Sequence, residues 1–220
     1  MKLIRDPEAG ATLDATTTMY PSRLEVVVGA KRFESSTSTH YGFVVEGRAR
    51  VGGAGLNLEA SAGAFFCIPG GLELDATGRV VVIERLGFLA MAAAGRIESA
   101  GRLSYIDGCT DSVLVMPPRL GDPVLNHLHF PAGITQSVHS HPSIRLGVVS
   151  SGRGVAYGPG AGTAWEEPLE SACVFLLESH EFHAFRTAAD VMNVIAYHPD
   201  SDWGPTDGVH PMLNRTYVRG

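Results

Sequence analysis

Glycine and proline divide this sequence into short apolar runs, and that division limits the folds the chain can adopt. The 220 residues include 26 glycines and 13 prolines, residues that favour tight turns. The runs between them are short and rich in β-branched residues, as in Leu24–Val28 and Ala172–Leu177. Helical periodicity is weak throughout. The sequence therefore predicts an all-β fold with many short strands.

Further strands are expected in both halves of the chain. They are two strands around Gly47 within Tyr41–Val51, then Gly63–Gly71, Arg79–Leu86, Val124–Phe130 and Val191–Tyr197. The stretch from Phe88 to Asp122 is expected to be irregular chain that connects the halves. The first 20 or so residues are polar and turn-prone, and we expect an arm that packs on a sheet or on a neighbouring molecule. The proline- and glycine-rich tail after His198 favours neither helix nor long strand, and with Trp203 it is expected to cover a barrel mouth or bridge two subunits.

Three histidines form a pattern typical of a metal site. His139 and His141 are two residues apart, so on a strand both imidazoles point to the same face. His183 follows the apolar run Ala172–Leu177. Two histidines at this spacing can also simply hydrogen-bond within a sheet. Three neutral imidazoles held on a rigid sheet would bind a divalent first-row metal.

The sequence around these histidines resembles the first motif of the cupin superfamily, G-x5-H-x-H-x(3,4)-E-x6-G. Gly133, His139, His141 and Gly152 stand at the family spacing, but Arg145 occupies the position of the glutamate ligand. Arginine offers only donors and cannot bind a cation. The second motif, G-x5-P-x-G-x2-H-x3-N, is matched only by His183. The resemblance implies a three-histidine metal site in place of three histidines and a glutamate.

The first half of the chain repeats the pattern of the second. Phe43–Gly47 parallels Val148–Gly152, and aligning the halves at Gly47 and Gly152 places Glu34 and Ser36 at the two histidine positions. His40 then stands at the position of Arg145, and Leu74 at that of His183. The resemblance therefore implies a bicupin, two jelly-roll (double-stranded β-helix) barrels in one chain. Residues 1–100 are expected to form a degenerate cupin barrel with the N-terminal arm, and residues 101–220 a metal-binding barrel with the tail.

Several polar residues are candidates for a role beside the metal. Arg145 is expected either to hold a substrate carboxylate in a bidentate pair or to turn outward to a surface acid. Gln136 is a candidate for orienting a substrate. Glu181 is a candidate general base, and so is Glu178, although we expect Glu178 to be exposed at the surface.

His127 and His129 share one face of the expected strand Val124–Phe130. If that face looks into the barrel, the two histidines line the site, contact substrate or join the ligands. Otherwise they lie on the solvent side or donate to backbone carbonyls.

Composition restricts the classes of function. With 45% hydrophobic residues the chain can bury a sizeable core, and with 18% charged residues and a net charge of −6 it offers no basic surface for nucleic acid or membranes. Cys67, Cys109 and Cys173 are widely spaced, so we expect free thiols. The N-terminus lacks the apolar core of a signal peptide and no segment is long enough to span a membrane, so we expect a cytoplasmic protein. By analogy with cupins we expect a homodimer that acts on a small molecule.

The chemistry implied by the resemblance remains open between three functions. Three-histidine cupins resemble the thiol and diketone dioxygenases, which implies a non-haem Fe(II) dioxygenase acting on a small anionic or enolisable substrate. A second possibility is an isomerase, cyclase or lyase in which a metal acts as a Lewis acid. A third is a sugar- or metabolite-binding cupin without enzymatic activity. One divalent ion is expected, with Fe(II) favoured over Zn, Mn, Ni or Cu.

Overall fold

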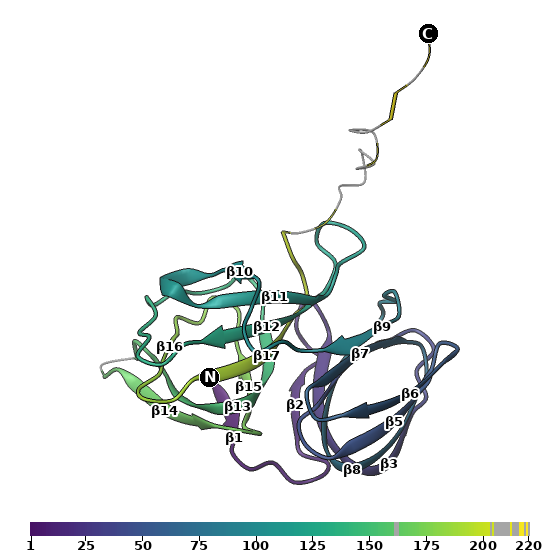
Figure 1. The fold of residues 1–220 in the computed structure, drawn as a ribbon, viewed down its shortest axis with the longest axis horizontal. Helices are drawn as coiled ribbons and strands as arrows, with labels where there is room; N and C mark the ends of the chain where they lie inside the picture. Colours follow the sequence, from purple (N-terminus) through teal and green to yellow (C-terminus); the bar gives the residue numbers. More distant parts are fainter. Residues whose placement is uncertain (161–162, 203, 205–211, 213–215, 218, 220) are drawn as a thin grey trace.

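The fold is all-β, with two antiparallel sheets and one 3-10 turn in the described residues. The structure is a computed structural model, and it describes residues 1–160, 163–202, 204, 212, 216, 217 and 219. Trp203 and most of the tail after it lie outside the described residues, as does the role expected for them. Figure 1 shows the two sheets as curved units side by side.

One sheet contains eight strands, in the order β2-β3-β8-β4-β7-β9, with β5 pairing β6 and β8. Their bounds are β2 Thr12–Ala15, β3 Ser22–Phe33, β4 Thr39–Val44, β5 Arg48–Gly53, β6 Leu56–Ser61, β7 Ala64–Pro69, β8 Leu72–Arg85 and β9 Ala93–Arg96. The expected strands of the first half are all present in this sheet.

The other sheet contains nine strands, in the order β1-β15-β13-β17-β12-β11-β10, with β14 and β16 pairing β13. Their bounds are β1 Lys2–Ile4, β10 Leu103–Ser104, β11 Thr110–Val115, β12 Val124–Phe130, β13 Arg145–Gly158, β14 Trp165–Glu170, β15 Val174–Leu177, β16 Ala184–Arg186 and β17 Met192–His198. The turn η1, Ile106–Gly108, precedes β11.

The N-terminal arm packs on both sheets. Strand β1 pairs with β15, with Leu3 opposite Phe175, whereas β2 pairs with β3 in the other sheet. The chain therefore begins at the edge of the nine-stranded sheet and crosses to the eight-stranded sheet within its first 12 residues.

The connection between the halves is more regular than expected. Strand β9 adds to β7, and β10 and β11 add to the nine-stranded sheet beside β12. The expectation of irregular chain was wrong for Thr110–Val115, where Asp111 and Asn126 form a side-chain pair across β11 and β12. Polar residues in this strand conceal the alternation that usually marks a strand.

Three buried apolar clusters hold the structure together. One fills the eight-stranded sheet around Phe66 and Ile68, and one fills the nine-stranded sheet around Phe130 and Phe175. The third lies between the sheets, where the ring centroids of Tyr41 and Tyr197 are 5.1 Å apart. All three cysteines are buried free thiols, as expected. No helix among the described residues is long and apolar enough to cross a membrane.

Gly152 shows why one motif glycine is required. Its φ is +78°, a left-handed conformation that glycine adopts without steric cost. A Cβ atom there would lie 2.0 Å from the carbonyl oxygen of Val191, the residue immediately before β17. Glycine at this position therefore allows β13 to approach the backbone that leads into β17.

Candidate metal centre

The three histidines come together from two neighbouring segments before β13 and β16. Backbone hydrogen bonds of 2.9 and 2.8 Å join His139 and His183 in both directions, as an isolated bridge. His141 lies in irregular chain, and the Pro142 that follows it has no N–H to donate to a strand ladder. The expectation that His139 and His141 share one regular strand was therefore wrong, although the spacing still brings their rings together.

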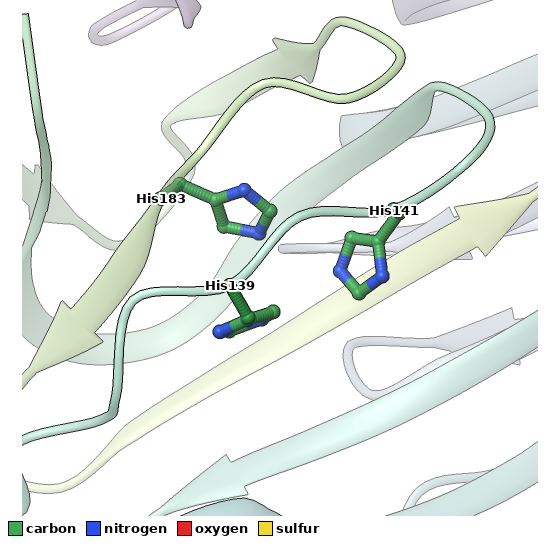
Figure 2. A group of neighbouring side chains, drawn as sticks. All are labelled: His139, His141 and His183. Carbon is green, nitrogen blue, oxygen red and sulfur yellow. The ribbon is translucent and has the colours of Figure 1, made fainter.

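The three imidazoles surround one shared space (Figure 2). One ring nitrogen from each lies within 4.8 Å of the others. The ring centroid of His139 is 5.1 Å from that of His141 and 4.6 Å from that of His183, and the centroids of His141 and His183 are 5.1 Å apart. No other group of this kind is found among the residues that the structure describes.

Backbone carbonyls orient two of the rings. His139 Nδ1 donates to the carbonyl of Ser137, and His183 Nδ1 donates to the carbonyl of Glu181, each at 2.8 Å. A carbonyl can only accept, so both nitrogens carry the proton and both Nε2 atoms keep a free lone pair. A hydrogen bond that fixes the tautomer in this way is the usual support of a metal-binding histidine. The donor set therefore fits a divalent first-row metal.

Burial favours the neutral form of two of the three rings, those of His141 and His183. Burial, together with the guanidinium of Arg145, lowers the pKa of His141 to about 3. Burial lowers the pKa of His183 to about 4. Neutral imidazole is the form that binds a metal, so protons compete little for these two nitrogens near neutral pH.

The histidines open into a small cavity between the strands of the nine-stranded sheet. Its free volume is about 30 Å³. The apolar part of its wall consists of Leu128, Phe130, Phe175, Leu177, Phe185, Val194 and Ala196. Its polar part consists of the three histidines with Tyr105, Gln136, Arg145 and His198. No described carboxylate lines the cavity, although that of Asp200 lies 3.9 Å from Nη1 of Arg145.

Arg145 lies in the wall of this cavity and does not turn outward to solvent. The residue is only 8% exposed. Its Nη1 donates to the carbonyls of Ser143 and Ile144, at 3.1 and 2.8 Å, and to the hydroxyl of Ser143 at 2.7 Å. Burial lowers its pKa to about 10, so the side chain still carries its charge at neutral pH. The residue that replaces the usual glutamate therefore places a cation beside the histidines.

Gln136 also reaches the cavity. The residue is 2% exposed, and its Nε2 donates to the sulfur of Cys109 at 3.4 Å. Its backbone carbonyl accepts from the hydroxyl of Tyr157. Burial raises the pKa of the Cys109 thiol, so this sulfur is held as a thiol and not as a thiolate.

The two candidate general bases lie outside the cavity. The carboxylate of Glu181 forms an ion pair with the amino group of Met1 and accepts from the backbone N–H of Glu178 at 2.9 Å. The carboxylate of Glu178 is exposed, as expected, and pairs with Lys2 at 2.8 Å. Glu181 approaches the site through its backbone, because its carbonyl orients His183.

His127 and His129 share one face of β12, as expected, but that face does not line the cavity. Both rings bind Oδ1 of Asn193, at 3.0 and 2.8 Å. Leu128 and Phe130, on the opposite face, line the cavity instead. Alternation in β12 fixes which residues share a face, but the side that looks inward depends on how β12 pairs with β17.

His198 and Tyr105 also line the cavity, although no sequence motif pointed to them. His198 ends β17 and lines the cavity, with its ring centroid 6.2 Å from that of His141. Burial and the charge of Arg145 lower the pKa of His198 well below its ordinary value. The alternation of Val194, Ala196 and His198 in the last strand could have indicated this position for His198, because alternate residues of a strand share one face.

Solved structures identify this architecture. No family model matches the sequence, and no curated protein matches it. A cupin 2 conserved barrel domain protein from Leptotrichia buccalis superposes with a TM-score of 0.63 at 15% identity, over 89% of this chain and 95% of that chain. The chain has the cupin fold.

Two other structurally similar proteins are named as enzymes. Salicylate 1,2-dioxygenase from Pseudoaminobacter salicylatoxidans, solved with gentisate, superposes with a TM-score of 0.57 at 13% identity, over 84% of this chain and 72% of that one. Oxalate decarboxylase from Bacillus subtilis, studied for its Mn(II) centres, superposes with a TM-score of 0.57 at 10% identity, over 88% and 73%. At these identities the likeness shows the fold alone, and fold does not determine chemistry.

Proposed function

We propose that the protein is a metal-dependent cupin enzyme that binds one divalent ion through His139, His141 and His183. The observation that carries this proposal is the convergence of three ring nitrogens within 4.8 Å of one another. The tautomers of His139 and His183, fixed by backbone carbonyls, leave both Nε2 atoms free for the ion. Three neutral ligands leave coordination positions for a substrate and leave the charge of the ion uncompensated.

The chemistry that we favour is oxygenation of a small anionic or enolisable substrate, with Fe(II) as the ion. Fe(II), once bound, supplies the redox chemistry that oxygenation requires. The protein itself contributes the charge of Arg145, which attracts an anion, and an apolar wall that excludes water. The name of the salicylate 1,2-dioxygenase neighbour supports this choice.

A second candidate is a lyase or isomerase in which the ion acts as a Lewis acid. The likeness to oxalate decarboxylase, a protein with Mn(II) centres, favours it. The same residues would serve both reactions, because each needs an anionic substrate beside the ion. Zn, Mn, Ni or Cu would then take the place of Fe(II).

Metal analysis of natively purified protein, followed by oxygen uptake with small carboxylates, thiols and diketones, separates these functions. Stoichiometric iron with substrate-dependent oxygen uptake supports the dioxygenase. Turnover without oxygen supports the Lewis-acid enzyme. A bound metal with a retained ligand and no turnover of any compound would replace both with a binding protein. Absence of any divalent metal under iron, zinc or manganese supplementation would refute the metal site itself.

We also propose that the chain is a bicupin whose first barrel, within residues 1–100, is degenerate and whose second, within 101–220, holds the site. Glu34 and Ser36, at the histidine positions of the first half, are exposed. Leu74, at the position of His183, is buried in the apolar cluster of the eight-stranded sheet. These residues suit packing and solvation, and not metal binding.

A homodimer is the proposed assembly. Strands β9 and β10 end their sheets, and pairing between copies would cover such edges. Light scattering coupled to size-exclusion chromatography tests this proposal, because a monomeric mass at micromolar concentration would contradict it.

A further inference from the structure

The charge of Arg145 opposes the binding of a cation by the neighbouring histidines. Arg145 lines the same cavity as the three rings. Burial and this charge together lower the pKa of His141, so the charge acts at the space between the rings. Two positive charges repel each other strongly where water is largely excluded. A buried arginine beside a site for a divalent ion therefore requires a group that offsets its charge.

Asp200 supplies a negative charge next to Arg145. Its carboxylate lies 3.9 Å from Nη1, and no other acidic side chain in the described part of the chain pairs with Arg145. The side chain of Asp200 is 21% exposed, so solvent screens the pair only in part. Burial lowers the pKa of Arg145, and the carboxylate of Asp200 acts in the opposite direction. Asp200 does not line the cavity, so it acts on the site through Arg145 and not as a ligand.

Ser143 holds the two charges together. Its hydroxyl donates to Oδ1 of Asp200 and accepts a hydrogen bond of 2.7 Å from Nη1 of Arg145. Ser143 lies two residues before β13 and Asp200 two residues after β17, and these strands pair with each other. The ladder between β13 and β17 therefore brings Asp200 to the arginine, although the two residues are far apart in the sequence.

We propose that Asp200 is a positioning residue that partly offsets the charge of Arg145 and so preserves the affinity of the three histidines for a divalent ion. Arg145 stands where the cupin motif has a glutamate ligand, so the ligand set lacks the carboxylate that would offset the charge of the ion. Asp200 returns a negative charge from behind the arginine. This inference rests on the proposed function, because it concerns the affinity of the same site for its ion.

Competition titration of metal-free protein with Zn(II) and a chromophoric chelator tests this role. Asp200→Asn keeps an acceptor for Ser143 but removes the charge, and it should weaken Zn(II) binding by about tenfold or more. Arg145→Gln removes the repulsion and should bind Zn(II) at least as tightly as the wild type. Asp190→Asn is the matched control, because Asp190 pairs with Arg153 at the surface. The same change of charge there should alter the affinity by less than about twofold.

The double variant distinguishes an effect of charge from a structural role. If Asp200 acts by offsetting Arg145, Asp200→Asn combined with Arg145→Gln should bind Zn(II) within about threefold of the wild type, because neither charge remains. A structural role predicts that the double variant binds no more tightly than Asp200→Asn alone. That result would overturn the proposal, and so would wild-type affinity in Asp200→Asn.

The wild type tests the proposed function separately. Zn(II) binding by the wild type together with unaltered affinity in Asp200→Asn leaves the metal site intact and overturns only the role of Asp200. Absence of Zn(II) binding by the wild type refutes the metal site and the inference with it. If Asp200→Asn does not fold, Arg145→Gln decides the question, because weaker Zn(II) binding than in the wild type contradicts a repulsion by Arg145.

Discussion

Replacing His141 with alanine should remove the metal and leave the fold intact. The ring of His141 is partly exposed and makes no hydrogen bond with any described residue, whereas His183 is buried and bonded to its neighbours through its backbone and its ring. The stability of the fold comes from the apolar clusters, to which His141 does not belong. The free energy of unfolding of the metal-free protein should therefore change by no more than about 0.5 kcal/mol.

The loss of metal affinity gives this prediction its magnitude. Changes to residues that only support a ligand reduce metal affinity by about 10- to 100-fold, so removal of a ligand should cost at least about 100-fold. At a metal concentration 100 times the dissociation constant of the wild type, binding stabilises the wild type by about 2.7 kcal/mol. A variant that binds 100-fold more weakly would gain only about 0.4 kcal/mol under the same conditions. The difference of about 2.3 kcal/mol corresponds to roughly 5–9 °C in Tm for a chain of this length.

Thermal unfolding with and without metal, together with metal analysis after desalting, measures both quantities. His129→Ala is the matched control, because His129 lies outside the cavity and binds Asn193. The control should keep the metal and the metal-dependent rise in Tm. Stoichiometric metal in His141→Ala, or equal loss of metal in His129→Ala, would refute the assignment of the ligands.

Three further predictions follow from burial and backbone geometry. In the metal-free folded protein the pKa is about 3 for His141 and about 4 for His183, so both rings stay neutral as the pH falls below neutrality. In the unfolded chain the same two rings bind protons below about pH 6.5. The free energy of unfolding should therefore fall as pH drops from about 6.5 toward 4, by at most about 1.4 kcal/mol per pH unit for each ring. Urea unfolding of His183→Gln should show a weaker dependence of this free energy on pH than the wild type. Equal dependence in both proteins would contradict the prediction. Leu146→Ala, in the cluster between the sheets, should cost about 2–5 kcal/mol in urea unfolding, whereas the exposed Val138→Ala should cost almost nothing. Gly152→Ala should cost about 2 kcal/mol or more, because its Cβ meets a backbone carbonyl, and a wild-type unfolding midpoint would show that the strand shifts freely.

The sequence predicted most strands of the fold because glycine and proline mark their ends. Strand β12 occupies the expected residues Val124–Phe130, and β4 and β5 flank Gly47 as expected. Strand β11 was missed because its buried Asp111 is paired with Asn126, a partner on another strand that no local pattern reveals. Long-range pairing of this kind is a property of the folded chain and not of a window of sequence.

Dependence on long-range pairing also limited the prediction of the candidate site. The three-histidine cluster was predicted, whereas the inward face of β12 and the position of His198 were not. The rings of His139, His141 and His183 come together as the spacing predicted, although none of the three residues lies in a regular strand. The inward face of β12 was not predictable, because β12 alternates apolar and histidine residues and only its register against β17 decides between them. His198 was missed because it stands alone at the end of a strand, without a motif around it.

The position of β1 has a consequence for the order of events during synthesis. Its partner β15 lies about 170 residues farther along the chain, so at about 5–20 residues per second β1 waits roughly 10–35 s on the ribosome before its partner exists. A C-terminal fragment that starts at residue 101 would lack β1 altogether and would expose the free edge of β15 to other chains. Strand β1 thus completes a sheet whose other strands all follow residue 100.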